Sequence, residues 1–344
     1  MLNKQSAYDR VRGLDTIRAV CAFWVVMGHF GGPPVLAGID RSTWVGWLIG
    51  GIFNNFWSGP SAVIVFFVIS GFCIHYPYAK TLLIPSIGEY GLRRYFRIGI
   101  PLVVVTALSP LIGIKLSMFH DDILWSLVAE LVYYTLYPAL LMVRQKGVSW
   151  RIMLGVSFVM ALVLVATNPI AGNYPSWGLY LNWVLGLPCW IAGCFLAENV
   201  AQSKPAVQET IWRWRFAVWL TSVVCSVLRF HSPIGYPWTL NFFALLVAIW
   251  LAKEIDYHST RNRLGWLENA GKWSYSVYLA HVPANKIFQI LAIPNLGYLI
   301  NWSAKMIFIL GVSYMFYLLV ERPSHMVARK LGKSIACWNM KSNI

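Results

Sequence analysis

The chain has 344 residues, of which 58% are hydrophobic and 12% charged, and its mean hydropathy is +0.58. A soluble globular protein carries about 25% charged residues, so this composition excludes an ordinary soluble domain and indicates an all-α, polytopic membrane protein. The formal net charge of +15 does not indicate a nucleic-acid partner, because the basic residues lie in short segments between apolar runs rather than on one continuous face.

Windows of about 20 apolar residues predict about ten membrane-spanning helices, which form one helical bundle and a single domain over residues 1–344. An additional interfacial or re-entrant piece is expected between Trp44 and Phe56. The expected spans are roughly 15–36, 56–76, 98–114, 123–143, 151–168, 178–197, 215–230, 237–252, 273–292 and 301–320.

The lysines and arginines indicate how the bundle is oriented. With the N-terminus inside, 23 of the 28 basic residues fall in cytoplasmic segments and 5 fall outside. This asymmetry follows the positive-inside rule. Both termini are therefore expected in the cytoplasm, with a basic N-terminal segment of about 1–13 and a tail of about 321–344.

The six cysteines provide no framework for a metal or a disulfide network. Five lie in apolar segments, Cys337 lies in the tail, and no two have CxxC spacing. We interpret them as small apolar residues and expect no metal site and no bound cofactor.

The first span carries an arginine at its start and a histidine deep inside. Arg18 and His29 are eleven residues apart, which places them about 20° apart on one helix face and about 16 Å apart along the axis. Ionisable groups in a bilayer are costly and usually face a protein interior or a wet cavity. The alternative is that Arg18 anchors the helix and His29 is a packing residue.

The second span contains Ser70-Gly71, which predicts a close approach of another helix or of a ligand. The basic and aromatic segment 90–98 follows and contains Arg93, Arg94 and Arg97. Arginine forks match phosphate geometry, so this segment, with Arg12 and Arg18 on the same side, is a candidate phosphate-binding patch. Positive-inside anchoring alone would also account for it.

The fourth span places Ser126, Glu130, Tyr133 or Tyr134, and Tyr137 on one polar stripe, at spacings of three and four. Helix rise and a 30 Å hydrocarbon core put both Glu130 and His29 about 12 Å from the outer boundary. The two side chains can therefore meet, and a carboxylate beside an imidazole would orient it as a general base. The alternative is a buried acid hydrogen-bonded to tyrosines.

The last two spans add further polar positions. Ser274, Tyr278, His281 and Asn285 share one face of the ninth span. The tenth ends in Glu321-Arg322-Pro323, which predicts an ion pair and a helix stop.

Taken together, these stretches resemble membrane-bound acyltransferase family 3, the bacterial multi-pass O-acyltransferases. The matching strings span residues 14–323 in the family's order: LDTIRA with His29 eleven residues after the arginine, FFVISGF, LRRYFRI, WSLVAEL, SYSVYLAH and VERP. One departure is the extra residue in Arg97-Ile98-Gly99-Ile100-Pro101, which leaves the start of the third span open.

The resemblance implies a transferase of the bacterial inner membrane that moves an acyl group, acetyl by default, from cytoplasmic acyl-CoA to a hydroxyl of a surface polysaccharide or glycolipid. It implies that His29 is the essential histidine and that Glu130 is the matching acidic position, and direct transfer and a covalent acyl-histidine relay are both open. Donor binding would fall to Arg18, Arg12, Arg93, Arg94 and Arg97. The supporting cavity would contain Asp15, Ser70, Trp125, Ser126, Tyr133, Tyr278 and His281.

A transporter or flippase of glycans or small solutes is the alternative, since such proteins also use buried His and Glu. That class often carries inverted repeats or paired broken helices, and the sequence shows neither.

Overall fold

The structure is a computed structural model that describes residues 11–36, 39–114, 116, 124–203, 210–259, 265–292, 294 and 296–342, with backbone alone for 333–342. Within these ranges the regular structure is entirely helical. Six helical segments are long and apolar enough to cross a membrane. The all-α membrane fold is thus confirmed, whereas the count of ten spans and the side of the termini remain predictions.

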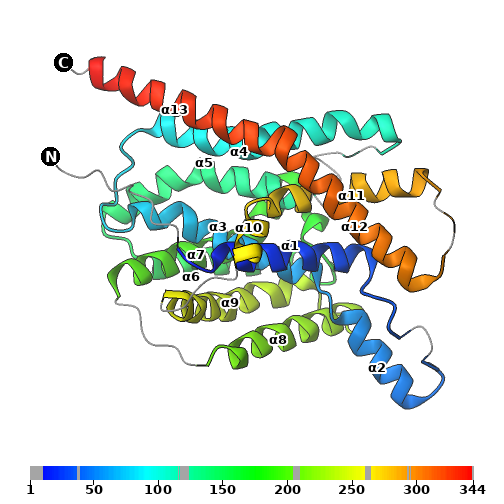
Figure 1. The fold of residues 1–344 in the computed structure, drawn as a ribbon. Helices are drawn as coiled ribbons and strands as arrows, with labels where there is room; N and C mark the ends of the chain where they lie inside the picture. The colour runs from blue at the N-terminus through cyan, green and yellow to red at the C-terminus, as the bar shows by residue number, and fades with distance from the viewer. Residues whose placement is uncertain are drawn as a thin grey trace.

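Each of the ten expected spans overlaps an α-helix, and the piece expected near Trp44 is a helix as well. Short 3₁₀ turns cover Tyr76–Tyr78, Ser109–Ile112 and Tyr174–Trp177. The α-helices (Figure 1) are α1 Leu14–Phe30, α2 Trp44–Asn55, α3 Gly59–His75, α4 Ile87–Leu108, α5 Trp125–Gln145, α6 Trp150–Ala166, α7 Gly178–Gln202, α8 Trp212–His231, α9 Tyr236–Ser259, α10 Gly265–Gly271, α11 Ser274–Ile290, α12 Tyr298–Phe316 and α13 Arg322–Ser342.

Helix α3 lies at the centre of the bundle and is buried along most of its length. It packs closely against α7 because both helices carry glycine at the crossing. A Cβ on Gly71 would lie 1.9 Å from the Trp190 carbonyl oxygen, and one on Gly193 would lie 2.0 Å from that of Val68. Small residues permit this backbone approach in membrane helices, so the close packing expected at Ser70-Gly71 is confirmed for Gly71.

Helix α4 begins eleven residues before the expected start of the third span, at Ile87 instead of 98. The Ser86 side chain caps it by accepting a hydrogen bond from the Glu89 N–H at 3.2 Å, as Ser does at helix N-termini. The basic residues after residue 90 therefore lie on a helix, and their side chains point in directions set by helical phase.

The predicted helix stop at Pro323 is wrong. A π-helical turn at Tyr317–Glu321 connects α12 to α13, which contains Pro323 in its first turn and lies along α4 (Figure 1). The Arg322 N–H donates to the Tyr317 carbonyl five residues back, so the helix continues into α13 through this π turn. The Glu321 carboxylate accepts from the Ser276 hydroxyl at 2.5 Å and N–H at 3.1 Å, in place of the expected pair with Arg322.

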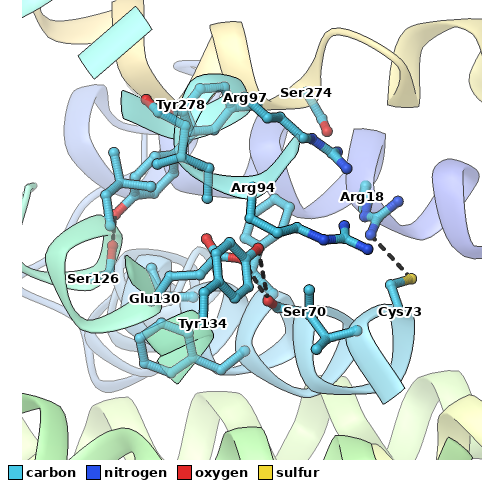
Figure 2. Close-up of a pocket in the computed structure, with 17 residues that line it drawn as sticks. Arg18, Ser70, Cys73, Arg94, Arg97, Ser126, Glu130, Tyr134, Ser274 and Tyr278 are labelled. Carbon is cyan, nitrogen blue, oxygen red and sulfur yellow. Dashed lines mark hydrogen bonds between the residues drawn. The ribbon is translucent and has the colours of Figure 1, made fainter. Parts of the chain in front are cut away.

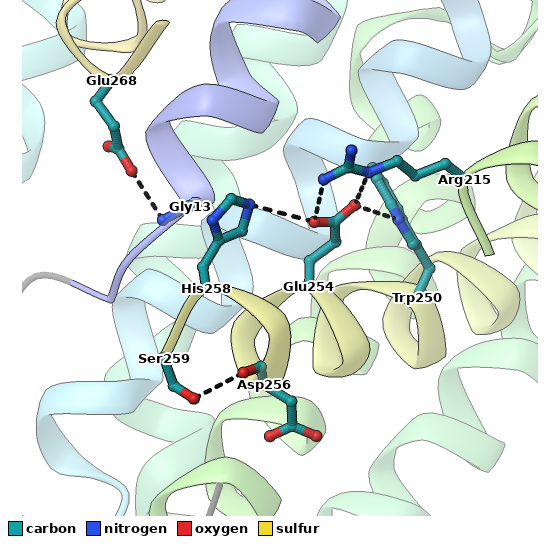
Figure 3. A network of polar contacts seen from close by, with 8 residues as sticks. All are labelled: Gly13, Arg215, Trp250, Glu254, Asp256, His258, Ser259 and Glu268. Carbon is teal, nitrogen blue, oxygen red and sulfur yellow. Dashed lines mark hydrogen bonds and ion pairs between the residues drawn. The ribbon is translucent and has the colours of Figure 1, made fainter. Parts of the chain in front are cut away.

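The start of α1 is held by contacts that fix where Arg18 begins to project. Gly13 has φ +87° and donates its N–H to Glu268 Oε1 at 2.9 Å (Figure 3). A Cβ on Gly13 would lie 2.4 Å from the His258 ring, and one on Gly271 of α10 would lie 1.9 Å from the Asp15 carbonyl oxygen. Glycine is therefore required at both positions.

His258 belongs to a buried polar network beside this contact. Glu254 on α9 accepts two hydrogen bonds from Arg215 on α8, at 2.6 and 2.9 Å, and one from Trp250 at 2.8 Å (Figure 3). His258 Nε2 lies 3.4 Å from the same carboxylate. The network joins α8 and α9 to the chain where it enters α1.

Candidate functional site

A narrow cavity of about 90 Å³ lies among α1, α3, α4, α5 and α11 (Figure 2). Typical small-molecule pockets measure about 300–1,000 Å³, so it suits a slender chain rather than a whole cofactor-sized ligand. On α3 its wall follows the helical spacing of Val63, Phe66, Phe67, Ser70, Cys73 and Ile74, as expected for one face of a helix.

Three arginines gather at one end of this cavity (Figure 2). Arg18 Nη1 donates to Asp15 Oδ1 at 3.1 Å, and its Nη2 donates to Cys73 Sγ at 3.2 Å. Arg94 and Arg97 reach the same place because residues three apart share one side of α4. No ion pair involves Arg94 or Arg97 in the described part of the chain, so this end carries excess positive charge that an anionic group would offset.

Two of the predicted donor-binding arginines lie elsewhere. Arg93 pairs with Glu89 one turn earlier on α4 and lies against Gly332 of α13. Arg12 is exposed in the turn before α1 and does not line the cavity. Helical phase explains the difference for Arg93, since it projects about 100° away from Arg94.

The middle of the cavity is occupied by Glu130. Its carboxylate accepts from the Ser70 hydroxyl and from the Tyr134 hydroxyl, each at 2.5 Å, and Trp190 Nε1 donates to Ser70 at 3.3 Å. The open alternative for Glu130, an acid hydrogen-bonded to tyrosine, therefore describes its contacts in the structure.

The other end of the cavity is closed by a hydrogen bond between hydroxyls. Ser126 Oγ and Tyr278 Oη lie 2.7 Å apart, and the Phe66 ring contacts that of Tyr278 at 6.1 Å between centroids. Both hydroxyls point toward this end (Figure 2).

His29 lies beyond this end and contacts another histidine. His29 Nδ1 and His281 Nε2 are 2.7 Å apart, with the two rings stacked at 4.8 Å. The structure does not bring Glu130 into hydrogen-bonding contact with His29, so the predicted pair is wrong. Depth in the membrane leaves the rotation of each helix undetermined, so it could not identify the partner of His29.

The hydrogen bonds assign the protons of the histidine pair. His281 Nδ1 lies 2.6 Å from the Tyr278 carbonyl oxygen, which can only accept, so Nδ1 carries the hydrogen. His281 is fully buried, where a charged imidazolium is costly, so its Nε2 is the acceptor and His29 Nδ1 the donor. Nε2 is then the basic atom of His29, which is exposed at the end of α1.

The remaining predicted residues have supporting positions. Asp15 is buried and holds Arg18. Trp125 stacks on Tyr174 at 5.3 Å, and the Tyr133 hydroxyl donates to the Trp183 carbonyl at 2.7 Å; neither lines the cavity. The sequence-based prediction of site residues omitted Tyr134 and Cys73, although each lies one helical turn from a predicted residue, Glu130 and Ser70 respectively.

Comparison with protein families gives one match to this chain. A family model described as an acyltransferase domain matches residues 11–318. The comparisons with curated proteins and with solved structures find no match. The match includes every helix that lines the cavity and both histidines of the pair.

Proposed function

The chain belongs to the family described as an acyltransferase domain, and from this premise we propose that it is an O-acyltransferase of the bacterial inner membrane. It moves a short acyl group, by default acetyl, from cytoplasmic acyl-CoA to a hydroxyl of a surface polysaccharide or glycolipid. The observation that carries the proposal is a narrow cavity with three arginines at one end and a polarised histidine pair beyond the other.

Donor binding is assigned to the arginine end. Arg18, Arg94 and Arg97 would hold the phosphates of CoA, because guanidinium forks match phosphate oxygens. The slender arm of the thioester would extend along the cavity past Glu130, and its carbonyl would come to rest near Ser126 and Tyr278. Their hydroxyls would donate hydrogen bonds to the oxygen that becomes negative during attack.

The chemical step is assigned to His29. Its Nε2 removes the proton from the acceptor hydroxyl, and the oxygen attacks the thioester carbonyl. A carbon–oxygen bond forms, the carbon–sulfur bond breaks, and the CoA thiolate takes the proton back from His29. Because Tyr278 lines the cavity and its ring also contacts that of His281 at 6.1 Å between centroids, the Ser126–Tyr278 hydrogen bond would open for the reacting groups to meet.

The test uses purified protein in nanodiscs with radiolabelled acetyl-CoA and an envelope glycan extract. Wild type should release CoA and transfer label, and His29→Ala should lower kcat by about 10²–10⁴-fold, the usual contribution of a general base. His231→Ala is the matched control, because this exposed histidine ends α8 away from the cavity.

If His29→Ala still binds the donor, its loss of activity would be assigned to the chemical step. Full activity in that variant would remove His29 from the mechanism. A wild type that leaves the thioester intact with acceptor present would favour the transporter or flippase alternative.

A further inference from the structure

A second cavity, of about 420 Å³, lies at the end of α1 opposite the arginines. Its wall comes from the last turn of α1, the segment that follows, the end of α2 and Trp57. We propose that this α2 cavity binds an anionic part of the acceptor glycan, next to the sugar that receives the acyl group. The inference rests on the proposed function and adds the acceptor's chemical class.

Charge is the first observation behind this assignment. Arg41 lines the α2 cavity, and none of the described residues that line it is acidic. The neighbouring Asp40 accepts the Ser42 N–H at 2.9 Å, and within the described ranges no ion pair or hydrogen bond is formed by the Arg41 side chain. A guanidinium in such a cavity is suited to a bidentate contact with a carboxylate or a phosphate.

The second observation is the aromatic wall. Phe53 and Trp57 line the cavity, and the Trp57 ring is supported by Trp24 at 4.4 Å and Phe56 at 4.7 Å between centroids. Rigid aromatic faces with a few polar groups are typical of binding cavities, and they pack well against the apolar face of a sugar ring. Asn54 adds an amide to the same wall.

Helical phase relates the α2 cavity to His29. Met27 lines the cavity and is two residues from His29 within α1, which puts it about 160° around the helix from the histidine. The cavity and His29 therefore lie on opposite sides of the end of α1, separated by about 10 Å, the width of a helix. A single small acceptor in the cavity would not reach the base.

A chain of sugars can bridge this distance over the end of the helix. Gly28 and His29 are exposed there, and α1 ends at Phe30. On the His29 side, Lys305 donates to the Phe30 carbonyl at 3.4 Å and lies over the Phe30 ring. Two cations thus flank the end of α1, which favours an acceptor of at least two sugars with an acidic group.

The test measures acceptor dependence in nanodiscs of neutral phosphatidylcholine. Envelope glycans from the cells that make the protein are separated by anion exchange into neutral and anionic fractions, and transfer of label from acetyl-CoA is followed at increasing amounts of each. The variants are Arg41→Gln, Arg41→Lys and, as the matched control, Arg229→Gln. Arg229 contacts Asn173 and Phe230 and does not line the α2 cavity.

We expect label in the anionic fraction. Arg41→Gln should raise its half-saturating amount by about 10-fold or more, in line with loss of a charged hydrogen bond, with the maximal rate and the KM for acetyl-CoA unchanged. Arg41→Lys should give a half-saturating amount between those of wild type and Arg41→Gln, and Arg229→Gln should give the wild-type value.

Label confined to the neutral fraction, or an unchanged half-saturating amount in Arg41→Gln, would overturn the inference. So would inhibition of wild type, but not of Arg41→Gln, by phosphatidylglycerol in the nanodisc, because a lipid headgroup would then occupy the site. Failure of the proposed function is separate from these results, since wild type would then consume no acetyl-CoA with either fraction.

Discussion

At the scale of single residues, His281 lies beside His29 in the place that the sequence suggested for Glu130, and in the proposed mechanism it orients the His29 ring. Its Nε2 accepts from His29 Nδ1 because its own Nδ1 donates to the Tyr278 carbonyl. It is a positioning residue, since it acts on the acceptor hydroxyl only through His29. Residues that orient a reactive imidazole in this way also select its tautomer.

We expect His281→Leu to lower kcat by about 10–100-fold, the range seen when an orienting partner of a histidine is removed from a metal site. The KM for acetyl-CoA should stay within about two-fold, because the donor site is remote. His281→Gln should restore most of the rate, since an amide can both donate to Tyr278 and accept from His29. Steady-state kinetics measure kcat and KM for both variants. Equal kcat values in His281→Leu and His281→Gln would contradict the positioning role of His281.

Cys73 offers a direct probe of donor binding. It lines the cavity, is partly exposed and accepts a hydrogen bond from Arg18, so a thiol reagent that enters the cavity would meet it. In a Cys337→Ser background, a maleimide should label Cys73, and CoA should protect it. Mass spectrometry reads the label, with buried Cys194 as the unlabelled internal control. Labelling unaffected by saturating CoA would place the donor elsewhere.

At the scale of elements, the phase of α4 separates the donor-binding arginines from an anchoring one. The sequence placed Arg93, Arg94 and Arg97 in one patch, because a cluster read as a loop has no defined side-chain directions. The structure continues α4 through the cluster, so Arg94 and Arg97 face the cavity while Arg93 pairs with Glu89.

Arg94→Gln and Arg97→Gln should each raise the KM for acetyl-CoA by about 10-fold or more, the effect expected for losing a charge-assisted hydrogen bond to phosphate. Arg93→Gln should change it much less, because Arg93 pairs with Glu89 and does not line the cavity. Initial rates at varied donor give these values. A larger effect from Arg93 than from Arg94 would reverse the assignment.

Elements were largely predictable because each expected span has enough apolar residues to identify a helix. The face formed by Ser274 and Tyr278 was also predictable, since it needs only the spacing within one helix. The partner of His29 was not, because it depends on how α1 and α11 are rotated against each other by contacts such as Phe30 with His281. The ends of two helices also differ from those expected from the sequence. Ser86 caps α4 before the expected start, and a π turn continues the last span beyond Glu321.

At the scale of the whole molecule, α1 connects the two ends of the site, with Arg18 at one and His29 at the other. An alanine inserted between Val20 and Cys21 would rotate His29 by about 100° and move it by about 1.5 Å relative to Arg18. Transfer should fall below detection, because His29 can no longer contact His281. Protection of Cys73 by CoA should persist, which separates misalignment from unfolding, and normal transfer would show that the two ends are not rigidly coupled.

Because one straight helix carries both groups, it sets a fixed length of about 16 Å between the anchor for the donor's phosphates and the base. If the proposed donor site is right, the protein would select its donor by the length of the thioester arm. A thioester with a shortened arm would leave its carbonyl short of Tyr278 even when its phosphates are bound, whereas an altered nucleobase beyond the arginines would matter little. Specificity for the acyl group would then depend on the His29 end of α1, and specificity for the nucleotide would depend on the Arg18 end.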